Sequence, residues 1–188
     1  MSTDDTHNLH QTLALFLQAL PSDSPPYCLI GALAVGTWGR VRATQDLDFL
    51  MMLTDETSAR MINSLEPFGF TLDTRWAYQN PMAKERVIRL RHTIYPLDLI
   101  KTADRHEAEV LARRMIVPFA QTSIWVATAE DLILLKLKAS RDHDFEDARS
   151  IVRRQGSHLD PDYLWSWADQ LGLQGELTYV LKTAAEPI

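Results

Sequence analysis

Two aspartates separated by one residue stand at the head of an apolar segment, Asp46-Leu-Asp-Phe-Leu-Met-Met-Leu53. The composition of this segment predicts a strand, in which Asp46 and Asp48 share one face because successive side chains alternate. Two ionised carboxylates side by side among apolar residues repel each other, and their burial is costly unless a cation or hydrogen-bond donors neutralise them. The expected neutralising ion is Mg²⁺ or Mn²⁺.

A third carboxylate lies in a similar setting, because Tyr95-Pro-Leu-Asp-Leu-Ile100 is a short predicted strand that carries Asp98 between two leucines. Three carboxylates on adjacent strands suit a two-metal site. One ion lowers the pKa of an attacking hydroxyl, and the other holds a triphosphate and stabilises the leaving oxygen. The predicted chemistry is in-line nucleotidyl transfer, with Asp46, Asp48 and Asp98 as catalytic and metal-binding residues. Taken singly, Asp46 also suits a strand cap and Asp98 a pairing with an arginine at position 89 or 91.

The segment before the first aspartate offers groups that a triphosphate needs. Tyr27–Ile30 is a predicted buried strand, and a helix starts directly after it at Gly31. Free N–H groups at a helix start attract phosphate, and a glycine there lets the backbone approach the ligand closely. Arg40, Arg42 and Thr44 lie between this helix and the carboxylate strand, where they can contact phosphate oxygens.

These residues resemble the signature of nucleotidyltransferases of the DNA polymerase β superfamily, a Gly-(Gly/Ser) pair followed at a set distance by Asp-x-Asp or Asp-x-Glu. Gly31-Ala32, thirteen intervening residues and Asp46-Leu47-Asp48 carry the resemblance. The phrase Gly-x-x-Ala-x-x-x-x-Gly-x-x-Arg-x-Thr-x-Asp-x-Asp is most similar to the small prokaryotic branch that includes AbiEii-like abortive-infection toxins. The resemblance implies an NTP substrate, held in part by the backbone N–H groups of Gly31 and Ala32.

A second block, from Thr128 to Arg149, resembles the branch's second motif region, where a helix lysine precedes an Asp-x-x-Asp pattern. By position, Lys136 matches the lysine that contacts the nucleotide. Asp144 or Asp147 matches the downstream acid that orients the nucleotide or closes the site. With the first block, this resemblance covers most of the chain.

The acceptor of the nucleotidyl group is open, since transfer RNA, a protein side chain, a small antibiotic and another nucleotide would all suit the same catalytic half. The resemblance also implies a toxin–antitoxin role with an antitoxin partner. Ala32, where the family has Gly or Ser, favours an alternative: a catalytically weak or inactive nucleotide-binding or regulatory module of the same fold. Asp-x-Asp also occurs in glycosyltransferases, but too little chain precedes it here for their nucleotide-sugar domain.

The composition predicts one compact protein, because 188 residues of which 46% are hydrophobic can bury a sizeable core. The expected division is a catalytic core, residues 1–127, and a helical C-terminal part, residues 128–188. A net charge of −6 argues against non-specific coating of nucleic acid, which rests on Lys and Arg. The chain shows neither a membrane-spanning apolar run nor a signal peptide, so a cytoplasmic protein is expected.

The periodicity and turn residues predict an α/β (α+β) fold, a mixed β-sheet flanked by helices with a helical C-terminal part. The expected strands are Tyr27–Ile30, Asp46–Leu53, Phe70–Thr74, Arg86–Arg91, Tyr95–Ile100 and Ser123–Val126. The expected helices are Asn8–Leu20, one starting at Gly31, Thr57–Leu65, Ala103–Met115, one after the N-cap Thr128, Asp144–Arg154, and two between Asp160 and Thr183.

Overall fold

The computed structural model describes residues 8–119 and 122–184. The α-helices are α1 (Leu9–Ala19), α2 (Gly31–Trp38), α3 (Asp55–Leu65), α4 (Thr74–Gln79), α5 (Arg105–Arg113), α6 (Ala129–Ala139), α7 (Asp142–Gln155), α8 (Pro161–Leu171) and α9 (Gln174–Ala184). The strands are β1 (Tyr27–Ile30), β2 (Leu47–Met51), β3 (Thr71–Leu72), β4 (Val87–His92), β5 (Tyr95–Lys101), β6 (Met115–Phe119) and β7 (Thr122–Val126). Short 3₁₀ turns occupy Glu66–Phe68, Ala83–Glu85 and Gly156–His158.

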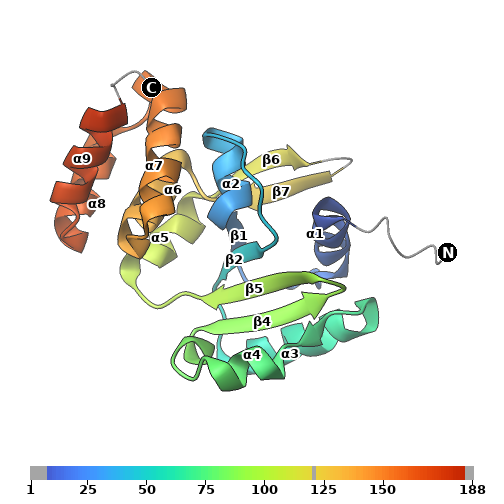
Figure 1. Ribbon diagram of the computed structural model, residues 1–188. Coiled ribbons are helices and arrows are strands. Elements are labelled where there is room, and N and C mark those ends of the chain that lie inside the picture. Colours follow the sequence, from blue (N-terminus) through green and yellow to red (C-terminus); the bar gives the residue numbers. More distant parts are fainter. Residues whose placement is uncertain (1–7, 120–121, 185–188) are drawn as a thin grey trace.

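The strands form one mixed sheet of seven in the order β3-β4-β5-β2-β1-β7-β6. β2 runs parallel to β5 and β1 runs parallel to β7, and the other neighbours are antiparallel. The centre of the sheet is therefore built by β1, β2 and β5, which come from separate parts of the chain. The predicted mixed sheet with flanking helices is confirmed (Figure 1).

The two faces of β2 serve different purposes. Phe49 points to the core, where its ring lies 4.6 Å from that of Phe16 on α1 and 6.0 Å from that of Tyr27 on β1. Its neighbour Asp48 points to the opposite face because side chains alternate along a strand. Figure 1 shows α2, α6 and α7 on one side of β5 and β4, and α3 and α4 on the other.

The C-terminal helices pack against the first part of the chain and do not stand apart from it. α7 contacts α2 and α9, and α6 contacts both α2 and α8. The indole N–H of Trp38, at the end of α2, donates to the carbonyl of Ala127 at 2.8 Å. Figure 1 shows α8 and α9 as an outer layer beyond α7.

Two elements were absent from the sequence-based expectation. The helix expected over Ala103–Met115 ends at Arg113, because Arg114 adopts an extended backbone and Met115 begins β6, which pairs with β7. The strand expected over Phe70–Thr74 is limited to Thr71–Leu72. Asp73 ends it by capping α4, accepting a hydrogen bond from the Trp76 backbone N–H at 2.9 Å.

The strand predicted over Asp46–Leu53 is also shorter in the structure. β2 begins at Leu47, so Asp46 precedes the strand and only Asp48 is part of the ladder. Asp46 belongs instead to the end of the segment that links α2 to β2.

Candidate active site

The backbone at Gly31 lies directly against the side chain of Asp48. Gly31 follows β1 with φ +69°, a left-handed conformation that favours glycine, and it starts α2. The antiparallel pairing of β1 with β2 sets Ile30 opposite Asp48. A Cβ atom at position 31 would lie 2.0 Å from Oδ2 of Asp48, so only glycine fits here. The beginning of α2, with its free N–H groups, therefore adjoins the carboxylate.

Asp48 and Asp98 are neighbours across the parallel β2–β5 pair, in direct register. The pKa of Asp48 is raised to about 6, first by burial and then by the negative charges of Asp98 and Asp46, against the opposing effects of Lys136 and Arg89. Among the described residues, none donates a hydrogen bond to the Asp48 carboxylate or forms an ion pair with it. Asp48 is thus a half-buried acid that lines the cleft and has no compensating partner among the described residues.

Asp98, by contrast, already has a partner. The guanidinium of Arg89 on β4 donates to both carboxylate oxygens, Nε to Oδ1 at 2.7 Å and Nη2 to Oδ2 at 2.5 Å. The same guanidinium lies over the ring of Trp76, 4.7 Å from its centroid. The pairing that the sequence offered as a structural explanation of Asp98 is therefore present in the structure.

Arg40 and Arg42, predicted to contact phosphate, both reach Asp147 on α7. Nε and Nη2 of Arg42 donate hydrogen bonds to this carboxylate at 3.1–3.2 Å, and Nη2 of Arg40 lies 3.4 Å from Oδ1. Thr44 accepts a hydrogen bond from the backbone N–H of Asp46 at 3.3 Å.

Lys136 on α6 is also engaged by acids. Its side chain is 7% exposed, and Nζ lies 2.8 Å from Oδ1 of Asp144 and 3.0 Å from Oδ2 of Asp147. Nε of Arg141 adds a second contact to Asp144 at 2.6 Å. Hydrogen bonds from Arg141 and Lys136 outweigh burial and lower the pKa of Asp144.

A cleft of about 680 Å³ unites these groups. The predicted site residues that line it are Gly31, Ala32, Arg42, Thr44, Asp46, Asp48, Asp98, Lys136 and Asp144. Arg40 and Asp147 are not among the lining residues. The charged residues of the lining that the sequence did not assign to the site are Arg86, Arg89, Glu107, Lys138, Arg141 and His143. They come from β4 and the turn before it, from α5 and α6, and from the start of α7 with its N-cap. Of these, the sequence had offered Arg89 as a partner of Asp98.

The donors in the cleft suit a hard divalent cation, since carboxylate oxygens are the ligands that Mg²⁺ and Mn²⁺ prefer. A cation would neutralise the charge of Asp48, which has no partner among the described residues. Within residues 8–119 and 122–184, however, no group of three His, Cys, Asp or Glu side chains is gathered closely enough to hold an ion. Asp46 and Asp48 both line the cleft, and Asp98 is paired with Arg89.

Comparison with solved structures identifies the fold. The antibiotic-resistance factor ANT(2″)-Ia in solution superposes with a TM-score of 0.58 and 13% identity, over 90% of this chain and 96% of that chain. ANT(2″)-Ia in complex with adenylyl-2″-tobramycin gives a TM-score of 0.56 and 15% identity, over 87% and 96%. This chain has a nucleotidyltransferase fold. No family model and no curated protein matches the sequence.

The nucleotidyltransferase fold is accompanied by no membrane-crossing element in the described part of the chain. None of the helices there is both long enough and apolar enough to span a bilayer.

Proposed function

We propose that the protein is a metal-dependent nucleotidyltransferase that moves an NMP group from an NTP to an acceptor hydroxyl and releases pyrophosphate. One observation carries the proposal. Asp48 lies beside Asp98 and against the beginning of α2 at Gly31, without a partner among the described residues, in a cleft that Arg42, Lys136 and Arg141 also line. Carboxylates and cationic side chains that line one cleft suit a metal-bound triphosphate.

In this proposal each group has a defined role. Asp46 and Asp48 hold Mg²⁺ or Mn²⁺, which supplies charge neutralisation and lowers the pKa of the attacking hydroxyl. The backbone N–H groups of Gly31 and Ala32 bind phosphate oxygens at the start of α2. Asp98, once released from Arg89, accepts the proton of the acceptor hydroxyl. The acceptor oxygen bonds to the α-phosphorus as the α–β bridging bond breaks, and pyrophosphate leaves.

The acceptor class is a separate part of the proposal. The related fold was solved with adenylylated tobramycin, so a small molecule with a hydroxyl group is one acceptor class to test beside RNA and protein. The toxin–antitoxin role and the AbiEii-like relationship rest on the sequence resemblance alone, and both stay proposals.

A second candidate function is a nucleotide-binding or regulatory module without transfer activity. Two observations favour it: Ala32 replaces the usual Gly or Ser, and Arg89 occupies both oxygens of Asp98. This candidate shares the metal and nucleotide site, so binding measurements alone do not separate the two functions.

The decisive experiment incubates the protein with each α-labelled NTP, Mg²⁺ or Mn²⁺, and RNA, protein or a polyhydroxylated small molecule as acceptor. Wild-type protein and Asp169→Asn, an exposed acid on α8, are expected to transfer label, and Asp48→Asn is not. Metal-dependent NTP binding without transfer to any acceptor would favour the regulatory module. Full activity of Asp48→Asn would refute the assigned site.

A further inference from the structure

The segment that leads to Asp46 is held almost entirely by one helix. Residues 38–46, termed here the connecting segment, run from the end of α2 to the start of β2 without regular structure after Trp38. Four residues of α7 contact it: Asp147, Ser150, Arg154 and Gln155. Asp147, Ser150 and Arg154 are three and four residues apart, the spacing that places side chains on a common helix face, and Gln155 follows Arg154 in the chain.

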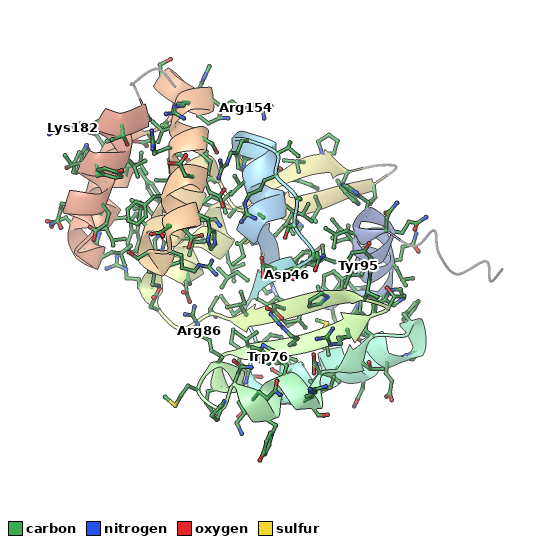
Figure 2. All side chains as sticks on the ribbon, viewed as in Figure 1. Asp46, Trp76, Arg86, Tyr95, Arg154 and Lys182 are labelled. Carbon is green, nitrogen blue, oxygen red and sulfur yellow. The ribbon has the colours of Figure 1, made fainter. Side chains whose placement is uncertain are left out.

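The first half of the connecting segment is fixed through its backbone. Gln155 Nε2 donates to the carbonyl of Trp38 at 2.7 Å, and Arg154 Nη1 donates to that of Gly39 at 2.8 Å. The backbone N–H of Arg40 donates to Oγ of Ser150 at 3.1 Å. The fit at Gly39 is close, since a Cβ atom there would lie 2.5 Å from Oγ of Ser150. Figure 2 shows Arg154 at the end of α7 that lies beside α2.

The side chains of Arg40 and Arg42 are held by Asp147, so the contacts of α7 with the segment extend to Arg42, four residues before Asp46. The carboxylate of Asp147 is fully buried. Arg42 donates to both of its oxygens, Arg40 donates to Oδ1, and Lys136 forms an ion pair with Oδ2. Burial would raise the pKa of Asp147, but the hydrogen bonds from Arg42 and Lys136 outweigh it and lower that pKa. Asp147 does not line the cleft, and each of its oxygens is already bonded. It is therefore placed to hold protein groups and not a nucleotide.

We propose that α7 positions Asp46: Asp147 and Arg154 hold the connecting segment in the geometry that brings this carboxylate into the cleft beside Asp48. Asp147 is then a positioning residue and not a nucleotide ligand. The inference rests on the proposed function for its catalytic consequence only. It also means that the helical part beginning at residue 128 is required for the metal site and does not serve the acceptor alone.

The structural half is tested without metal or nucleotide, by ¹⁵N relaxation of the chain alone. Two adjacent arginines give a matched pair: Arg154 holds Gly39, whereas Arg153, among the described residues, donates to the carbonyls of Thr183 and Ala184 at the end of α9. Backbone order parameters over residues 39–46 should stay near ~0.85 in wild type and Arg153→Gln and fall toward ~0.6 in Arg154→Gln and Asp147→Asn. Unchanged values in both test variants would overturn the proposal.

The catalytic half is tested by separating metal from nucleotide dependence. Loss of the carboxylate that holds the segment leading to a metal ligand is expected to raise the Mg²⁺ concentration for half-maximal transfer about tenfold in Asp147→Asn. The nucleotide KM at saturating Mg²⁺ should stay close to that of wild type. A raised nucleotide KM at every Mg²⁺ concentration would identify a nucleotide ligand and overturn the proposal. Should Asp147→Asn fail to fold, Arg154→Gln carries the same comparison with a smaller shift.

The two proposals fail separately. Wild-type protein that neither binds nor transfers a nucleotide would refute the proposed function, while the order parameters would still decide whether α7 holds the connecting segment. Normal transfer by a variant with a loosened segment would refute the positioning role and leave the proposed function intact.

Discussion

At the scale of single residues, the candidate site contains an acid, Asp48, whose ionised form the fold does not stabilise. Asp48 is half-buried near two other acids, and the described residues supply it with no hydrogen bond. Such a group destabilises the folded chain when it is ionised, because its charge is partly desolvated and lies near other negative charges without gaining a partner. A structural acid would have been paired as Asp147 is.

The raised pKa of Asp48 predicts how the effect of Asp48→Asn on stability depends on pH. The folded-state pKa of about 6 lies above the ordinary value of 3.8, so the folded chain binds more protons between these values and stability falls as pH rises through them. At pH 8 the variant should be more stable than wild type, by about 1–3 kcal/mol, and near pH 4 the difference should largely vanish. Urea unfolding at both pH values measures it. Asp169→Asn should show neither effect, and an Asp48→Asn variant less stable than wild type at pH 8 would contradict the prediction.

Gly31 gives a second prediction at this scale. An alanine there would carry both the strain of a left-handed backbone and an overlap with the Asp48 carboxylate. Gly172 has nearly the same backbone, φ +70°, with no atom within 4 Å of the added Cβ. Both variants should lose about 1–2 kcal/mol from backbone strain, but only Gly31→Ala should lose more and abolish transfer. Denaturant midpoints and transfer rates decide it, and equal losses in the two variants would count against the close approach.

At the scale of elements, helices meet through polar groups that are not all satisfied. His106 on α5 is buried against Trp167 on α8, with ring centroids 5.0 Å apart. Neither ring nitrogen has a hydrogen-bond partner among the described residues, and Nε2 lies 3.9 Å from the Asp131 carboxylate on α6. Burial first, and then the charge of Lys138, lower the pKa of His106 to about 4. This histidine is therefore neutral at the junction of α5, α6 and α8.

Acid should weaken this helix junction in a defined window. The folded-state pKa of His106 lies below the ordinary 6.5, so the unfolded chain binds more protons between about 4 and 6.5, and stability falls as pH decreases through that range. Replacing His106 with Leu should remove up to about 3 kcal/mol of that decline. Unfolding midpoints from pH 7 to pH 4 measure it, with the exposed His158→Leu as control. The same acid decline in His106→Leu and wild type would contradict the assignment.

At the scale of the whole molecule, the cleft is lined from both ends of the chain. Gly31 and Asp48 come from the first strands and helix, and Lys136 and Asp144 come from α6 and α7. A ligand that bridges these walls binds only the folded chain. Its binding should therefore stabilise the entire protein by mass action.

Thermal unfolding tests this bridging. NTP with Mg²⁺, at about 100 times its Kd, should stabilise the folded chain by about 2.7 kcal/mol and raise Tm by about 5–10 °C. Mg²⁺ alone should shift Tm much less, because the described residues do not gather three acidic or histidine ligands. Asp48→Asn should show no Tm shift when NTP and Mg²⁺ are added together. A shift of equal size with NTP alone would argue against a metal-bound triphosphate.

Local sequence patterns were sufficient for most of the elements and for the placement of two candidate site residues. Strand alternation set Asp48 opposite the core residue Phe49, and the turn before α2 set Gly31 next to a helix start. These relations hold over a few residues, where backbone geometry decides side-chain direction. The short elements α4 and β6 were not predicted. α4 forms where Asp73 caps a turn, and β6 forms where Met115 begins a strand that pairs with β7. Neither event produces a periodic pattern in the sequence.

Only the tertiary structure decided which charges meet. The Asp147–Arg42 ion pair and the contact of Arg154 with the carbonyl of Gly39 join residues that local spacing does not link, whereas for Asp98 the structure selected Arg89 from the two arginines that the sequence offered. Arg42 and Asp147 are far apart in the chain, and their pairing follows from how α7 packs against the end of α2. The sequence by itself determined the residue types needed for a metal and a triphosphate. Long-range packing determined which of those residues face the cleft and which support it from behind, because pairing across a fold is fixed by the sum of many distant contacts.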